Sequence, residues 1–189
     1  MIKNKTAIIF AGGKSSRMGQ DKALLPFGGF STLAQYQYQR LSKLFDRVYI
    51  SAKSNKFDFE VEVIEDCYKE SSPLVALVSI FERLEVQEVF VLSVDAPFVD
   101  SFTIDRLYRD SLSSKDIIVA LSPHGIEPLC AIYKRNILPK AKELIEKGTH
   151  RLQTLLSSVE TQIIKFDSED IFMNLNYIED YRQAIASKY

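Results

Sequence analysis

The sequence predicts an α/β fold in which helices cover a mostly parallel sheet. Apolar runs of strand length alternate along the chain with segments whose apolar residues recur at helical spacing. This alternation is typical of stacked βα units, because each helix carries the chain back to start the next parallel strand. Several runs are apolar throughout, as central strands covered on both faces should be. The predicted strands are residues 6–11, 47–52, 61–64, 88–94, 116–121, 128–134 and 162–166.

The clearest predicted helix begins at Ser72 and Pro73. Ser72 can accept a hydrogen bond from an unpaired amide of the first turn, where the missing N–H of Pro73 does no harm. The apolar residues that follow share one helical face: Leu74, Leu77, Val78, Phe81 and Leu84. The other predicted helices are residues 32–45, 102–112, 139–147, 151–158 and 177–186.

Length and composition indicate one domain that spans residues 1–189. The chain has 189 residues, of which 46% are hydrophobic, so it can bury a substantial core. We find no internal repeat and no convincing interdomain linker. Lys and Arg number 24 against 25 Asp and Glu, so no overall field draws the protein toward nucleic acid or an anionic membrane. Any anionic ligand must be held by local groups.

The sequence also predicts a soluble, cytoplasmic protein. The apolar run at residues 6–11 follows Lys3 and Lys5 but is too short for a secretion signal, and no run approaches the roughly twenty apolar residues that span a bilayer. Cys67 and Cys130 have no metal-ligand spacing, and so low a count is expected where thiols stay reduced. We therefore expect two inert, partly buried thiols.

The most informative segment is residues 7–22, AIIFAGGKSSRMGQDK, in which an apolar strand runs into a loop rich in glycine, hydroxyls and cations. Gly12 and Gly13 lack side chains, so backbone amides can approach phosphate oxygens closely. The loop adds hydroxyl donors and positive charge at Ser15, Ser16, Arg17 and Lys22. A plain strand-to-helix connection would usually be shorter. The loop therefore predicts a polyphosphate site.

Two familiar phosphate motifs are excluded by spacing. A P-loop would need a glycine five residues before Gly13, where Ile8 stands inside the strand. The dinucleotide pattern would need glycines where Lys14 and Arg17 stand, so hydride transfer to a nicotinamide has no support. Lys14 either reaches a phosphate or points into solvent.

The loop and its extension to Leu25, AGGKSSRMGQDKALL, resemble the signature loop of nucleotidyltransferases, and the molybdenum cofactor guanylyltransferase family most of all. The resemblance continues in the same order through most of the chain. It covers VIED at 63–66, SPL at 72–74, VDAPFV at 94–99, PLCAIY at 128–133 and NLNYIED at 174–180. The chain departs from the family at Ser51-Ala52-Lys53, where asparagines are frequent, and at Ser72-Pro-Leu-Val-Ala76, where Gly-Pro-Leu-Ala-Gly is common.

The resemblance implies a three-layer α/β/α, Rossmann-like nucleotidyltransferase fold and transfer of GMP from GTP to molybdopterin or Mo-molybdopterin, with Mg²⁺ as cofactor. It implies nucleotide contacts at Phe10, Ala11, Gly12, Gly13, Lys22, Ser51, Asp66 and Asp95. It also implies catalytic roles for Lys22, Asp95 and Arg17, a metal ligand in Asp95 and acceptor contacts at Asn174 and Asn176. We expect a monomer. Chaperones specific to particular molybdoenzymes are a further candidate class of partner.

Asp95 and Asp66 each follow an apolar stretch, so both should leave the sheet at the carboxyl ends of strands, where parallel sheets place their ligands. A carboxylate at Asp95 is a suitable oxygen ligand for Mg²⁺. The alternative roles are a helix cap or turn for Asp95 and an exposed turn residue for Asp66.

The chemistry expected here needs no protein base, because a phosphate monoester with a second pKa of roughly 6 is already largely ionised near neutrality. His124 and His150 lie in no nucleophile motif, so surface roles are expected for both. Residues 122–128 form either one wall of an acceptor pocket or a plain turn. The rival functions are related transferases that use CTP or a sugar phosphate acceptor, a noncatalytic nucleotide sensor or assembly factor, and an ordinary interaction domain.

Overall fold

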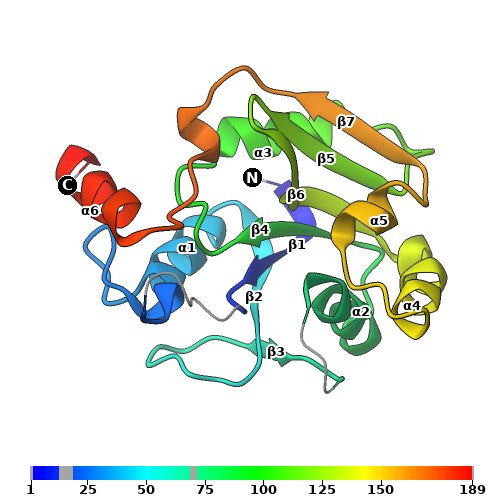
Figure 1. Cartoon of the computed structure of the whole chain (residues 1–189), viewed down its shortest axis with the longest axis horizontal. Helices are drawn as coiled ribbons and strands as arrows, with labels where there is room; N and C mark the ends of the chain where they lie inside the picture. Colours follow the sequence, from blue (N-terminus) through cyan, green and yellow to red (C-terminus); the bar gives the residue numbers. More distant parts are fainter. Residues whose placement is uncertain (1, 13–18, 69–71, 189) are drawn as a thin grey trace.

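The sheet of this protein contains seven strands, and six of them point the same way. The computed structural model describes residues 2–12, 19–68 and 72–188, and within these the strand order is β3-β2-β1-β4-β6-β5-β7 (Figure 1). β6 is antiparallel to both of its neighbours, whereas the other neighbouring strands are parallel. The expected mostly parallel α/β sheet is therefore confirmed.

Each predicted strand and helix has a counterpart in the structure. The strands are β1 (Ile2–Phe10), β2 (Phe45–Ala52), β3 (Val63–Glu65), β4 (Glu88–Ser93), β5 (Ile117–Ser122), β6 (Gly125–Lys134) and β7 (Thr161–Lys165). The helices are α1 (Leu33–Leu41), α2 (Pro73–Arg83), α3 (Ser101–Arg109), α4 (Leu138–Glu146), α5 (Leu152–Leu156) and α6 (Ile178–Lys188). Three 3-10 helices join them: η1 (Lys22–Leu24), η2 (Arg135–Ile137) and η3 (Asp170–Phe172).

The two faces of the sheet bury different helices, which gives the three layers of the predicted fold. Successive residues of a strand point to opposite faces. In β1, Ala7 and Ile9 join a buried cluster with α1 and α3, whereas Ile8 and Phe10 join a second cluster with α2, α4 and α5. Figure 1 shows α1 and α2 separated by the central strands. The central strands are covered on both sides, as their unbroken apolar runs predict.

The predicted end of the first helix is wrong for a physical reason. The helix expected over residues 32–45 ends at Leu41, and Phe45 instead begins β2, where it pairs with Ile2. Phe45 also stacks on Phe90, with ring centroids 5.5 Å apart, so it is apolar because of this packing and not because the helix continues.

Within the described ranges, no helix combines the length and apolarity that a membrane crossing requires.

The run 122–128, expected to lie between two strands, is mostly strand. β5 ends at Ser122 and β6 begins at Gly125, so the turn between them is tight. Gly125 has φ 132°, a conformation that side chains rarely adopt, which explains a glycine there. This hairpin reverses the chain and makes β6 antiparallel.

Side-chain caps fix the starts of three helices. Ser72 accepts a hydrogen bond from the amide of Val75 at 3.1 Å, so the predicted cap of α2 is confirmed. Thr32 caps α1 in the same way, and Asp100 caps α3 by accepting from the amide of Thr103 at 2.7 Å. Each cap satisfies an amide that the helix itself leaves unpaired.

Asp100→Ala should destabilise the protein by about 1 kcal/mol, because the amide of Thr103 loses its acceptor. The free energy of unfolding in urea measures the effect. Asp105→Ala is the matched control, because Asp105 lies within α3 and its side chain is 62% exposed. Equal losses in the two variants would contradict the capping role.

Candidate active site

The carboxyl ends of β1, β2 and β4 meet at one edge of the sheet. Phe10 of β1 is paired with Ser51 of β2 on one side and with Ser93 of β4 on the other. Backbone hydrogen bonds continue the register beyond the strands, from the amide of Ala11 to the carbonyl of Ser51 and from the amide of Val94 to the carbonyl of Phe10. The glycine-rich loop and Asp95 therefore leave the sheet side by side.

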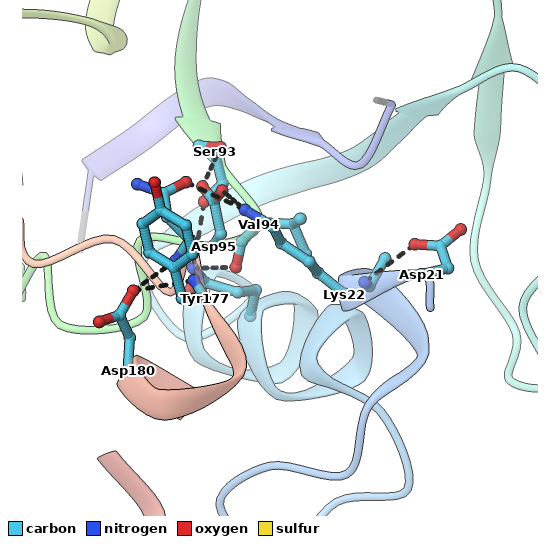
Figure 2. A network of polar contacts seen from close by, with 10 residues as sticks. Asp21, Lys22, Ser93, Val94, Asp95, Tyr177 and Asp180 are labelled. Carbon is cyan, nitrogen blue, oxygen red and sulfur yellow. Dashed lines mark hydrogen bonds and ion pairs between the residues drawn. The ribbon is translucent and has the colours of Figure 1, made fainter. Parts of the chain in front are cut away.

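Lys22 spans the distance between the loop and Asp95. Its Nζ lies 2.8 Å from Oδ2 of Asp95 and donates to Oδ1 of Asn176 at 3.1 Å (Figure 2). Lys22 is the first residue of η1, whose start Asp21 caps by accepting from the amide of Ala23 at 3.0 Å. This 3-10 turn after the loop directs Lys22 toward the strand ends.

Asp95 is fixed by contacts to both its side chain and its main chain. Its Oδ1 accepts from the hydroxyl of Ser93 at 2.5 Å, and its main-chain carbonyl accepts from the amide of Leu175 at 2.8 Å. The side chains of Lys22 and Asp95 are only 15% and 18% exposed. Because an ion pair that is partly withdrawn from water is weakly screened, this pair fixes the two groups more firmly than a surface pair would.

The segment after η3 folds over this ion pair. Asp180 Oδ2 accepts from the amides of Asn176 and Tyr177 at 3.1 and 2.8 Å, which fixes the turn before α6 (Figure 2). Asn176 is thereby placed beside Lys22, about 150 residues away in sequence. The structure thus brings Lys22, Asp95 and Asn176 together.

Lys56 is a candidate that the sequence did not single out. Its Nζ donates to the carbonyl of Ala11 at 3.1 Å and forms an ion pair with Asp21. The lysine comes from the irregular segment between β2 and β3, which carries no motif. It ties the entrance of the glycine-rich loop to the start of η1, and only the structure reveals it.

Two adjoining cavities open at this edge. The smaller has a volume of about 130 Å³, and the candidate nucleotide contacts Phe10, Gly12, Ser51 and Asp66 line it. The larger has a volume of about 410 Å³ and is lined by Asp95, Asn174 and Asn176, among others. Pro73 and Leu129 line both. The predicted donor and acceptor residues therefore fall into neighbouring cavities, with Asp95 in the larger one.

Two further ionisable groups, Glu127 and Cys130, line the larger cavity. Glu127 belongs to residues 122–128, for which the sequence left open a pocket wall or a plain turn. Burial, together with the nearby charge of Asp95, raises the pKa of Glu127, although a hydrogen bond from Ser122 and the proximity of His124 oppose the rise. Burial also raises the pKa of the Cys130 thiol far above its usual range, which keeps that thiol protonated. Glu127 and Pro128 therefore line a cavity wall and are more than a plain turn.

Some expectations need correction, and others fall outside the described residues. His150, expected at the surface, lines the larger cavity, with Nδ1 3.5 Å from the hydroxyl of Ser72. Cys67 is exposed and not partly buried. The roles predicted for Gly13 and Arg17 lie outside the described ranges, as does the choice between phosphate and solvent for Lys14.

The family follows from the comparisons with known proteins. Residues 7–163 match the model of the MobA-like NTP transferase domain. The chain belongs to this family. A molybdenum cofactor guanylyltransferase from Campylobacter jejuni subsp. jejuni (strain 81116) is 37% identical over 184 residues, which is 96% of each chain. One from Helicobacter pylori (strain G27) is 32% identical and covers 98% of this chain and 94% of its own.

Solved structures of the same fold extend the comparison. The crystal structure of molybdopterin-guanine dinucleotide biosynthesis protein A from Archaeoglobus fulgidus superposes with a TM-score of 0.82 at 19% sequence identity. The match covers 96% of this chain and 97% of that one. At this identity the likeness shows the fold alone, which is the three-layer nucleotidyltransferase fold that the sequence predicts.

The donor set suits a metal shared between the protein and a phosphate ligand. Among the described residues, no group of three or more His, Cys, Asp or Glu side chains is arranged to hold a metal ion without help. Asp95 offers a carboxylate after the end of β4, beside the cation of Lys22. Mg²⁺ keeps several waters and uses one or two carboxylates plus phosphate oxygens, so one carboxylate fits it.

A double-mutant cycle on Lys22→Met and Asp95→Asn should give a coupling free energy of roughly 1–3 kcal/mol for this pair. Urea unfolding without nucleotide or metal measures it. The exposed pair Lys165 and Asp167, with side chains 74% and 88% exposed, is the matched control and should show coupling near zero. Equal coupling energies for the two pairs would contradict the arrangement.

Proposed function

We propose that this protein transfers GMP from GTP to molybdopterin or Mo-molybdopterin and releases pyrophosphate. The observation that carries the proposal is the ion pair of Lys22 with Asp95, which lines the larger of two adjoining cavities, whereas candidate nucleotide residues line the smaller one. Relatives named molybdenum cofactor guanylyltransferase, similar over nearly the whole chain, support the choice of donor and acceptor.

The smaller cavity suits the nucleoside of GTP. Phe10 and Ala76 provide apolar walls, and Ser51 and Asp66 provide polar groups that can hydrogen-bond a base or ribose. Gly12 leaves open space where a side chain would otherwise stand, since no atom of the described residues beyond its chain neighbours lies within 4 Å of the position that a Cβ would take. The backbone there can approach a phosphate closely.

The triphosphate would then extend toward Lys22 and Asp95. Lys22 offsets the negative charge that builds up at the reacting phosphate. Asp95 supplies a negative charge opposite Lys22, and the hydroxyl of Ser93 fixes its carboxylate. Mg²⁺, held by Asp95 and phosphate oxygens, would supply further charge neutralisation and orientation. Catalysis is therefore mainly positioning and electrostatics.

The acceptor phosphate would enter from the larger cavity and attack the α-phosphorus in line. Its ionised monoester needs no general base near neutral pH. Asn174 and Asn176 line this cavity, and Asn176 also contacts Lys22. These amides can hold the acceptor while Lys22 holds the donor, which keeps the two reactants in attack geometry.

One assay tests the proposed reaction. The purified protein is incubated with Mg²⁺, molybdopterin and each of the four ribonucleoside triphosphates in turn, and pterin dinucleotide and pyrophosphate are measured. The proposal predicts both products with GTP. Product with CTP alone would contradict the choice of base, and GTP binding without any product would support a noncatalytic nucleotide sensor.

Asp95→Asn should lower metal-supported turnover by at least about 100-fold, because the site loses its carboxylate charge. The kcat of dinucleotide formation at saturating GTP measures this, and circular dichroism checks that the fold is intact. Asp167→Asn, at an exposed carboxylate, should leave kcat unchanged. Full activity in Asp95→Asn would remove this residue from the mechanism.

Lys22→Ala should weaken GTP binding about tenfold, because one charge-assisted contact to the triphosphate is lost. Calorimetric titration with a nonhydrolysable GTP analogue and Mg²⁺ measures the Kd. Lys165→Ala is the control, since the Lys165 side chain is 74% exposed and forms its ion pair with Asp167 and not with Asp95. An unchanged Kd in Lys22→Ala would show that the triphosphate lies elsewhere.

A further inference from the structure

A bulge in β6 shapes the larger cavity. Val119 of β5 pairs with Ala131, but the next residue, Ala120, pairs with Glu127. The intervening residues Pro128, Leu129 and Cys130 therefore have no partner on β5, and all three line the larger cavity. Bulges often occur beside active sites, where they redirect a side chain. This one places Glu127 at the cavity wall.

The bulge is fixed from inside the core. The hydroxyl of the fully buried Tyr133 donates to the carbonyl of Pro128 at 2.7 Å. On the other side of β6, Cys130 remains paired with Leu92 of β4. The wall is therefore built into the sheet and does not depend on a loop.

Among the described residues, a hydrogen bond reaches only one oxygen of the Glu127 carboxylate. Ser122 donates to its Oε1 at 2.8 Å, and the side chain is half-buried. Withdrawal from water raises the pKa of this carboxyl, so a donor on a ligand would be favoured as a partner. Asp95, in contrast, has both oxygens engaged by Lys22 and Ser93.

The proposed acceptor carries suitable donors. A pterin presents an N–H and an amino group side by side on its aminopyrimidinone edge, and a carboxylate can accept from both with its two oxygens. The cavity volume of about 410 Å³ lies within the usual range for small-molecule pockets, and Leu129, Leu152 and Phe172 add apolar lining for a flat ring.

We propose that Glu127 determines the specificity of the acceptor site, where its carboxylate accepts the two N–H groups of the pterin edge. This assignment rests on the proposed function. Guanine presents the same pair of donors, but Glu127 lines only the cavity without the candidate nucleoside contacts. The Glu127 carboxylate therefore recognises the acceptor and not the base of GTP.

The test compares pterin with lumazine, which carries an oxygen in place of the amino group and whose fluorescence, like that of pterin, reports binding. The wild-type protein should bind pterin about tenfold more tightly than lumazine, equal to about 1.4 kcal/mol. Glu127→Gln keeps an acceptor for Ser122 but loses the charge, and it should reduce this preference to about twofold or less. The KM for molybdopterin should rise about tenfold in the same variant, while kcat at saturation changes little.

Two further variants control the experiment. Glu146→Gln, at an exposed carboxylate of α4 outside both cavities, should keep the wild-type preference. Glu127→Asp keeps the charge but withdraws it from the ligand, so it should fall between the wild type and Glu127→Gln, and it serves if the glutamine variant folds poorly.

The remaining outcomes separate the inference from the proposed function. An unchanged pterin preference in Glu127→Gln, or a weakened affinity for the nonhydrolysable GTP analogue or for Mn²⁺ bound with it, would overturn the role of Glu127 while dinucleotide formation still stood. A wild-type protein that binds neither pterin nor molybdopterin and makes no dinucleotide would overturn both.

Discussion

The architecture of the site depends on one interaction, the ion pair between Lys22 and Asp95. Lys22 arrives from the glycine-rich loop, and Asp95 follows β4 at the centre of the sheet. The C-terminal segment joins them through Asn176 and through the amide of Leu175, which donates to the carbonyl of Asp95. Three distant parts of the sequence therefore meet at two charges that are largely withdrawn from water, and loss of either charge would leave the other poorly solvated.

The sheet explains why two substrates can meet there. The parallel strands β1 and β2 end side by side and their last residues line the smaller cavity, as expected for ligand sites of parallel sheets. The antiparallel β6 next to β4 adds its bulge, and the larger cavity forms against it. One reversed strand thus places a second binding space beside the first, and Asp95, the partner of Lys22, lines this second space.

The sequence predicts those parts of the fold and site that depend on local patterns. The apolar runs locate every strand, and Ser72 with Pro73 marks the start of α2, because strand burial and helix capping leave direct traces in residue order. The resemblance adds Asn176, which no local pattern would have placed beside Lys22. The helix was wrongly extended to Phe45 because this apolar residue continues the helical spacing in the sequence. Phe45 is apolar for another reason, its tertiary stacking on Phe90. His150 and Lys56 were missed as site residues because their positions depend on a cavity wall and an irregular segment. The sequence left the role of Glu127 open, because the position of this residue depends on a bulge.

The central claim is that the loop of Lys22 and the carboxylate of Asp95 act on a single triphosphate and metal complex. A crystal structure with a nonhydrolysable GTP analogue and Mn²⁺ tests it most directly, because anomalous scattering locates the metal. The account predicts Mn²⁺ at about 2.0–2.3 Å from an oxygen of Asp95, with triphosphate oxygens completing its coordination and Lys22 Nζ in contact with the phosphates. A nucleotide bound away from this edge, with Lys22 still paired to Asp95 and no metal beside them, would contradict it.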